Sequence, residues 1–391
     1  MAKGGRIRIY PEVFRRILDE YFEGTVEELV EVVGYKDFGK TKEERKEFFH
    51  KLLIEGGTLS VDQVEKLSRK IGIAVLAFYL SAPKVIPSRK RRKDNRTGVG
   101  ELSYKDRMWL RNAEIVQQIL EEILGERWEI NLPVESDAVG DLSGSRLAEN
   151  LRNILDFSPG RWSDYFEIFR ILRDKIESLG IPVLRLPIDA KNVRGSVIHG
   201  RVPLIIVSSG DFPAAQSFTL IHELCHIIQR DAGEDVMELC SEYAESRKNS
   251  REAFCNRVAG KFLLPNSIVE EEFERWEGTI EDFAESIARK YGVSRGVVYN
   301  RLIESHLISG EEYERYMEEN ARREWKLYYR GRPGKSDYGR IILNRYGKFT
   351  LSRLIEAYTE NRLDSSLLVH VLKLGRDDRI ADVEAVLYSW V

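Results

Sequence analysis

The five residues from His222 to His226 read His-Glu-Leu-Cys-His, and they restrict the possible folds of this chain more than any other feature. Residues four apart lie on one face of a helix, so the two imidazoles can bind one metal ion. The surrounding segment, Ser217–Ile228, is apolar on nearly every face, which is typical of a helix buried inside a domain. Histidine and glutamate are seldom buried without a partner or a metal, which disfavours an ordinary helix that only carries these residues. The sequence therefore predicts a buried metal-binding helix with Glu223 beside the ion as a proton acceptor.

A catalytic zinc site takes three protein ligands and keeps a fourth position open. A third histidine is missing from the extended form of the motif, because Gln229 and Ala232 occupy the positions of its glycine and histidine. Cys225, Cys240 and Cys255 are too dispersed along the sequence to predict a structural zinc knot. We therefore expect the third ligand to be a carboxylate on a second helix.

Several glutamates after the box are candidates for this ligand. They are Glu234, Glu238, Glu242, Glu245 and Glu252. Residues 252–265 form a predicted amphipathic helix that ends at a proline, with Glu252 in its first turn. Glu245 is the alternative, because its distance from the box is closer to that in thermolysin-like enzymes. The spacing favours Glu252 and leaves Glu245 open.

The two predicted helices resemble those of the ImmA/IrrE family of metallopeptidases, which includes enzymes that degrade phage repressors. The resemblance is carried by His-Glu-Leu-x-His and by the pattern Glu-x-x-Cys-Asn-x-x-Ala-x-x-x-Leu-Leu-Pro, which begins at Glu252. Upstream, residues 164–170 and 176–183 are similar to the helix and the first strand of the family's catalytic domain. The resemblance covers about residues 105–310. It implies a zinc peptidase in which His222, His226 and Glu252 bind the metal and Glu223 is the general base.

Two features depart from the family pattern. Cys225 stands where glycine is usual, and a long charged insert, Arg230–Arg251, separates the two helices. Cysteine behaves as a small apolar residue, so we expect the first departure to matter little. The insert could reshape the cleft, so the substrate preference of the family cannot be transferred to this chain.

Other residues of this region are candidates for supporting roles. The predicted strand Val202–Val207 could pair with an extended substrate, as the edges of sheets do. His199, Tyr243 and Arg257 are candidates for stabilising an oxyanion, although His199 is better explained as a residue on a strand surface.

The N-terminal region, about residues 1–85, is predicted to be helical. Helices are expected over Tyr10–Leu18, Thr25–Gly34, Lys42–Leu53 and Ser60–Ile73. The region resembles the helix-turn-helix domain of phage repressors, most closely at Leu59–Leu67 and Ala74–Pro83. At the position of the recognition helix, basic residues are mixed with Glu43, Glu44 and Glu47, whereas a DNA-binding helix is more often plainly basic there. A helical bundle that binds a protein or nothing is therefore the alternative to a DNA-binding domain.

The remaining segments complete a four-part organisation. A basic run, Ser88–Arg96, lies in a predicted solvated linker over 86–104, and such a run could also bind phosphates. Residues 311–391 read as a helical C-terminal extension, interrupted near 331–336. The expected fold class is α+β and mainly helical, with a zincin-like catalytic domain that contains a small β-sheet and is flanked by helical domains.

Composition limits the function classes. The net charge of −3 gives no overall attraction to nucleic acid or membrane, and no apolar run is long enough to span a bilayer. Three scattered cysteines indicate a reducing cytoplasm. We expect a cytoplasmic zinc endopeptidase that cleaves a repressor or an antitoxin-like regulator, with manganese or iron as possible replacements for zinc. The alternative is a DNA-binding regulator or toxin–antitoxin component whose metallopeptidase domain is a sensor without turnover. The sequence shows no heptad pattern and leaves the oligomeric state open.

Overall fold

The computed structural model describes residues 5–22, 24–34, 36–71, 78, 91–94, 102–134, 140–141, 143–162, 164–229, 236–240, 250–322, 337–374 and 377–389. Its helices and strands are β1 Arg6–Ile9, α1 Pro11–Tyr21, α2 Val26–Val33, the 3-10 helix η1 Lys36–Phe38, α3 Lys42–Glu55, β2 Gly57–Ser60, α4 Val61–Ile71, β3 Arg91–Asp94, α5 Tyr104–Leu124, α7 Ser145–Ile154, α8 Tyr165–Ser178, β4 Val183–Leu186, β5 Gly195–Ile198, β6 Leu204–Ser208, α9 Pro213–Ile228, β7 Val236–Cys240, α10 Ser250–Leu263, α11 Asn266–Glu274, α12 Ile280–Tyr291, α13 Arg295–Glu304, α14 Gly310–Arg322, α15 Tyr338–Thr359, α16 Ser365–Val371 and α17 Arg379–Tyr388. Helices predominate beside small sheets, which confirms the mainly helical α+β class. Among the described helices, none combines the length and the apolar character that crossing a bilayer requires.

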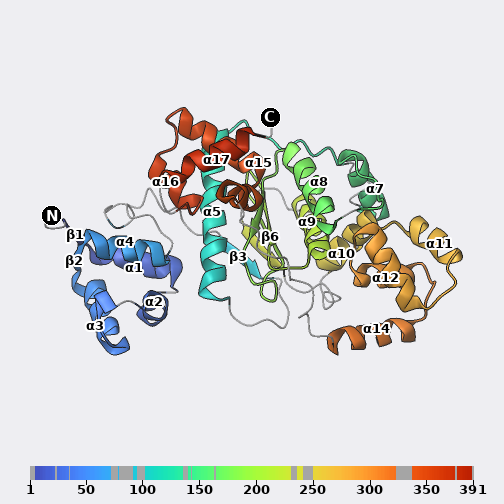
Figure 1. The fold of residues 1–391 in the computed structure, drawn as a ribbon, viewed down its shortest axis with the longest axis horizontal. Coiled ribbons are helices and arrows are strands. Elements are labelled where there is room, and N and C mark those ends of the chain that lie inside the picture. The colour runs from blue at the N-terminus through green and yellow to red at the C-terminus, as the bar shows by residue number, and fades with distance from the viewer. Residues whose placement is uncertain are drawn as a thin grey trace.

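The elements from β1 to α4 form a unit at one end of the molecule (Figure 1). The helices expected in this region are present as α1 to α4. The sequence analysis missed the strands β1 and β2, which pair antiparallel with Ile7 opposite Leu59. Ile7 and Ile9 are buried while their neighbours are exposed, as the two-residue period of a strand requires. Strands of four residues are too short for this period to be recognised in the sequence. Of the expected segment 74–83, all but Phe78 lies outside the described residues.

Helix α5 contacts this N-terminal unit. The ring of Tyr104 stacks on Phe22 with 4.9 Å between centroids, and its hydroxyl donates to the carbonyl oxygen of Ile71 at 3.0 Å. Arg107 of the same helix forms an ion pair with Glu28 of α2. The first turn of α5 therefore holds the N-terminal unit against the rest of the chain.

The larger sheet has the strand order β3-β7-β5-β6-β4. β4 runs parallel to β6, with Val183 opposite Ile205, and β5 runs antiparallel to β6 on its other side. β7 runs antiparallel to β5, which places Cys240 opposite Gly195. The expectation that the strand around Val202–Val207 pairs with a substrate is wrong, because β6 already has a neighbouring strand on each side.

Alternate residues of this sheet enter two different cores. One core lies between the sheet and helices α7 to α14 and includes Val183, Val197, Ile205 and Val207. The other lies between the sheet and helices α5, α15, α16 and α17 and includes Leu184, Leu186, Ile198, Leu204 and Ile206. In β7, Met237 and Leu239 belong to this second core. Because side chains alternate along a strand, Glu238 and Cys240 point to the opposite face, toward α9 and α10.

The C-terminal helices pack against the sheet and α5 (Figure 1). The hydroxyl of Tyr346 in α15 donates to the carbonyl oxygen of Val371 at 2.7 Å and also lies 3.1 Å from Oδ1 of Asn112 in α5. The helices expected after residue 310 are present as α14 to α17, while residues 331–336 lie outside the described residues. The last three helices therefore complete one face of the sheet and do not form a separate appendage.

The segment 86–104, expected as a solvated linker, contains a described strand. β3 pairs parallel with β7, with Arg91 opposite Val236, and forms an edge of the sheet. A run of charged residues without apolar periodicity gives no strand signal, so this pairing was not predicted. The rest of the basic run Ser88–Arg96 lies outside the described residues.

Candidate metal centre

Helix α9 carries the two histidines of the box. Pro213 occupies its first turn, which suits the fixed φ of proline. The helix lies in the core between the sheet and helices α8 and α10, and both imidazoles are fully buried. Nε2 of His222 and Nε2 of His226 are 3.1 Å apart. Two buried imidazoles one helical turn apart therefore point at a common position, as the spacing of the box predicts.

Helix α10 brings Glu252 to the same position. This residue lies in the first turn, as expected, and is 5% exposed. Its Oε2 is 3.2 Å from Nε2 of His222, and its Oε1 is 3.2 Å from Nε2 of His226. Burial raises the pKa of this carboxyl group, but its hydrogen bonds with the two imidazoles outweigh burial and leave the pKa well below the usual range. Of the other candidate ligands, Glu234, Glu242 and Glu245 lie outside the described residues.

The separations between these groups suit a tetrahedral metal ion. Zinc binds nitrogen and oxygen ligands at 2.0–2.2 Å, so two such ligands at the tetrahedral angle lie about 3.3 Å apart. The measured separations among the two histidines and Glu252 are 3.1 and 3.2 Å. The donor set of two imidazoles and one carboxylate is also that of a hydrolytic zinc site. The residues present therefore fit the metal that the box implies.

Glu223 is completely buried beside this position. Burial is the main cause that raises the pKa of its carboxyl group to about 8. Within the described part of the chain, its Oε1 has no hydrogen-bond partner. Gly195 of β5 leaves room for this carboxylate, because a Cβ atom at residue 195 would lie 2.2 Å from Oε1 of Glu223. The glycine thus permits the close approach of β5 to the predicted general base.

Glu238 of β7 contacts His226 on the ring nitrogen that faces away from the other candidate ligands. Its Oε2 lies 3.3 Å from Nδ1 of His226, and its Oε1 lies 3.0 Å from Nε2 of His199 and 3.5 Å from Nη1 of Arg251. Burial raises the pKa of Glu238, but the two imidazoles outweigh this effect and lower it. A carboxylate at the second ring nitrogen orients a metal-binding histidine and increases its basicity. Glu238 was a candidate metal ligand in the sequence, but it contacts the ligand His226 and does not point at the common position itself.

The oxyanion candidates are not brought together. His199 follows β5 and is fully buried against Glu238, so the expectation that it lies on a strand surface is wrong. Arg257 lies on α10, and Tyr243 lies outside the described residues. Of the two candidates that the structure describes, neither His199 nor Arg257 has a hydrogen bond or ion pair with Glu223.

Cys240 is the residue that the sequence analysis missed. Its Sγ lies 3.8 Å from Nε2 of His226 and 3.9 Å from Oε1 of Glu252. The donor atoms of His222, His226, Glu252 and Cys240 all lie within 4.8 Å of one another. The three cysteines are far apart in the sequence, but β7 and α10 bring two of them close to α9. A possible sequence signal is the alternation of Glu238 and Cys240 with Met237 and Leu239, which is the period of a strand.

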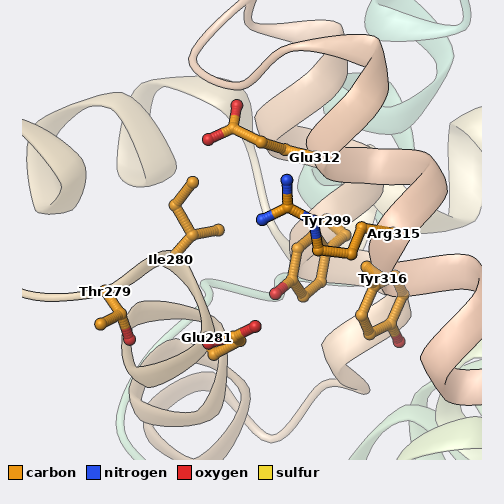
Figure 2. Close-up of a pocket in the computed structure, with 7 residues that line it drawn as sticks. All are labelled: Thr279, Ile280, Glu281, Tyr299, Glu312, Arg315 and Tyr316. Carbon is orange, nitrogen blue, oxygen red and sulfur yellow. The ribbon is translucent and has the colours of Figure 1, made fainter.

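A separate pocket of about 180 Å³ lies among α12, α13 and α14 and shares no residue with the centre. Figure 2 shows Glu281, Glu312 and Arg315 around it, next to the rings of Tyr299 and Tyr316. These two rings are stacked, with 3.7 Å between their centroids. The lining of the pocket contains no histidine or cysteine, and the group of metal-binding side chains found among the described residues is the buried centre.

None of the curated proteins matches this chain. The family model of the IrrE N-terminal-like domain, a peptidase family, matches residues 176–303. The matched region begins within α8, contains the box and Glu252, and ends in α13. This part of the chain is thus similar to the IrrE N-terminal-like domain, which supports the resemblance to the ImmA/IrrE family.

Proposed function

We propose that the protein is a zinc-dependent endopeptidase with a zincin-like catalytic domain. The observation that carries this proposal is the convergence of His222, His226 and Glu252 on one buried position next to Glu223. These residues lie in the region that matches a peptidase family. The fold alone would not support an activity, because one fold can host many functions. The donor set and its geometry are what favour metal-assisted hydrolysis.

Each residue of the centre would have a separate role. His222, His226 and Glu252 would hold the ion, and Glu238 would keep the ring of His226 in position. Bound zinc supplies a Lewis acid for the scissile carbonyl and lowers the pKa of water toward about 7. Glu223 would take the proton of the attacking water and give it to the leaving amine. Manganese and iron also accept nitrogen and oxygen ligands, so the metal has to be identified by measurement.

As substrate we propose a transcriptional repressor or an antitoxin-like regulator. This proposal is supported by the helical N-terminal unit, whose sequence resembles a helix-turn-helix domain and which is held against α5. For this unit we propose a protein as the partner and DNA as the alternative, because the charges of the unit favour a protein. Lys42 and Lys46 of α3 form ion pairs with Glu31 and Glu27 of α2, so these cations are already partly neutralised.

Metal analysis of variants tests the site. We expect elemental mass spectrometry to find one zinc per chain in the wild type, Glu223→Gln and Glu245→Ala, and a loss of zinc in His222→Ala and Glu252→Ala. Retention of zinc in Glu252→Ala together with loss of zinc in Glu245→Ala would assign the third ligand to Glu245. Candidate regulators are then co-expressed with the wild type and with Glu223→Gln. Continued cleavage by this zinc-loaded variant would contradict the proposed mechanism.

A second candidate function is a metal sensor without turnover. It is favoured by Cys240, whose thiol lies where a catalytic site would keep an open position. Binding of DNA that responds to zinc in a gel-shift assay, without cleavage of any regulator, would support this function over the peptidase.

A further inference from the structure

The position of Cys240 suits a metal ligand. Zinc binds a thiolate at about 2.3 Å, so a thiolate and an imidazole at the tetrahedral angle lie roughly 3.6 Å apart. Sγ of Cys240 lies 3.8 Å from Nε2 of His226 and 3.9 Å from Oε1 of Glu252. The side chain is buried at 2% exposure, and it also faces Oε2 of Glu223 at 3.9 Å. The thiol therefore lies on the side of the centre where the general base lies.

The pairing of β7 with β5 explains how Cys240 reaches this place. Cys240 lies opposite Gly195 in the antiparallel register, and residue 195 lies directly against the carboxylate of Glu223. A shift of the register by one residue would turn Cys240 to the other face of the sheet. This pairing also closes the edge of β5, which an extended peptide could otherwise join as an additional strand. β7 thus lies where such a peptide would lie, and its last residue reaches the centre.

We propose that Cys240 is a fourth protein ligand, which closes a His₂GluCys metal site in the resting protein. The inference rests on the proposed binding of zinc by His222, His226 and Glu252. Sites with four protein ligands are closed, whereas catalytic zinc sites keep one position for water or substrate. Turnover then requires that the thiolate of Cys240 leaves the ion. The same residue decides whether the centre is held inactive or can hydrolyse a peptide bond.

Cobalt is a suitable probe, because a thiolate bound to Co²⁺ gives a charge-transfer band in the near ultraviolet. The purified full chain is freed of metal and titrated with Co²⁺ alone. We expect one cobalt per chain with this band in the wild type, and loss of the band with retention of cobalt in Cys240→Ser. Cys225→Ser is the matched control and should keep the band. Cys255→Ser tests the other thiol that lies against His226, and it should keep the band as well.

X-ray absorption on the zinc-loaded wild type needs no variant, so it is informative even if Cys240→Ser fails to fold. A sulfur neighbour at about 2.3 Å is expected. Zinc or cobalt bound with nitrogen and oxygen neighbours only would overturn the role of Cys240 and leave the proposed peptidase site intact. A wild-type chain that binds neither ion would overturn both proposals. A band that persists in Cys240→Ser and vanishes in Cys255→Ser would show that Cys255 is the thiolate ligand. That result would also overturn the inference.

Discussion

Replacement of Glu238 by glutamine is expected to weaken metal binding without removing a ligand. The two oxygens of Glu238 face Nδ1 of His226 on one side, and His199 and Arg251 on the other. An amide keeps the size of the side chain but presents an oxygen on one side only, so its NH₂ group must face either Nδ1 of His226 or the pair of His199 and Arg251. Either His226 or the pair of His199 and Arg251 then loses its acceptor in a fully buried environment.

The size of this effect follows from the role of the carboxylate. Loss of a partner behind a metal-binding histidine typically lowers metal affinity 10- to 100-fold, which corresponds to about 1.4–2.7 kcal/mol. The dissociation constant for zinc is measured by competition with a chromophoric chelator at neutral pH. Glu277→Gln, which changes an exposed glutamate, is the control and should bind zinc like the wild type. A dissociation constant of Glu238→Gln within about threefold of the wild-type value would refute the assigned role.

Further changes test the surroundings of the centre. Gly195→Ala places a Cβ atom 2.2 Å from Oε1 of Glu223, so we expect bound zinc, no hydrolysis and a loss of about 1–3 kcal/mol in the free energy of unfolding. Gly310→Ala is the control, because nothing lies within 4 Å of a Cβ atom at that residue. Hydrolysis by Gly195→Ala would contradict the packing argument. Arg173→Met leaves Glu177, its buried partner at 3.3 Å, without its cation and should cost about 3–5 kcal/mol in urea unfolding at neutral pH. Because burial raises the pKa of Glu177, the contribution of this group to stability is present at low pH and lost as pH rises. The loss of unfolding free energy caused by Arg173→Met should therefore become smaller in acid. A loss that becomes larger in acid would contradict the raised pKa. Removal of the metal by a chelator should lower the melting temperature, since an ion at 100 times its dissociation constant stabilises the folded state by about 2.7 kcal/mol, and an unchanged melting temperature would contradict a folded-state site.

The part of the centre that could be predicted is the part that depends on local geometry. His222 and His226 meet because a helix places residues four apart on one face. Glu252 was favoured because a predicted helix begins next to it, although spacing alone left Glu245 open. Helices α1, α2 and α4 were predicted for a similar reason, since their apolar residues recur with the period of a helix.

The rest depends on contacts between distant segments. Glu238, Cys240 and His199 join the centre only because β7 pairs with β5 in one register, and that register is set by packing on both faces of the sheet. Charged residues dominate the insert Arg230–Arg251, which hides the five-residue strand inside it. β3 was missed for the same reason, because its pairing is made through the backbone and leaves no pattern in the side chains.

Two residues of the short strand β7 would therefore affect metal binding and catalysis in opposite ways. Glu238 strengthens His226 as a ligand, whereas Cys240, two residues later on the same face, is positioned to close the centre. Release of the whole strand would expose β5 to a substrate, but it would also remove Glu238 from His226 and weaken the site that has to act. Movement of the Cys240 side chain alone would open one position and keep this support. The second route fits the structure better, because Glu238 is also held by His199 and Arg251. In that case the substrate must approach the metal without adding a strand to β5.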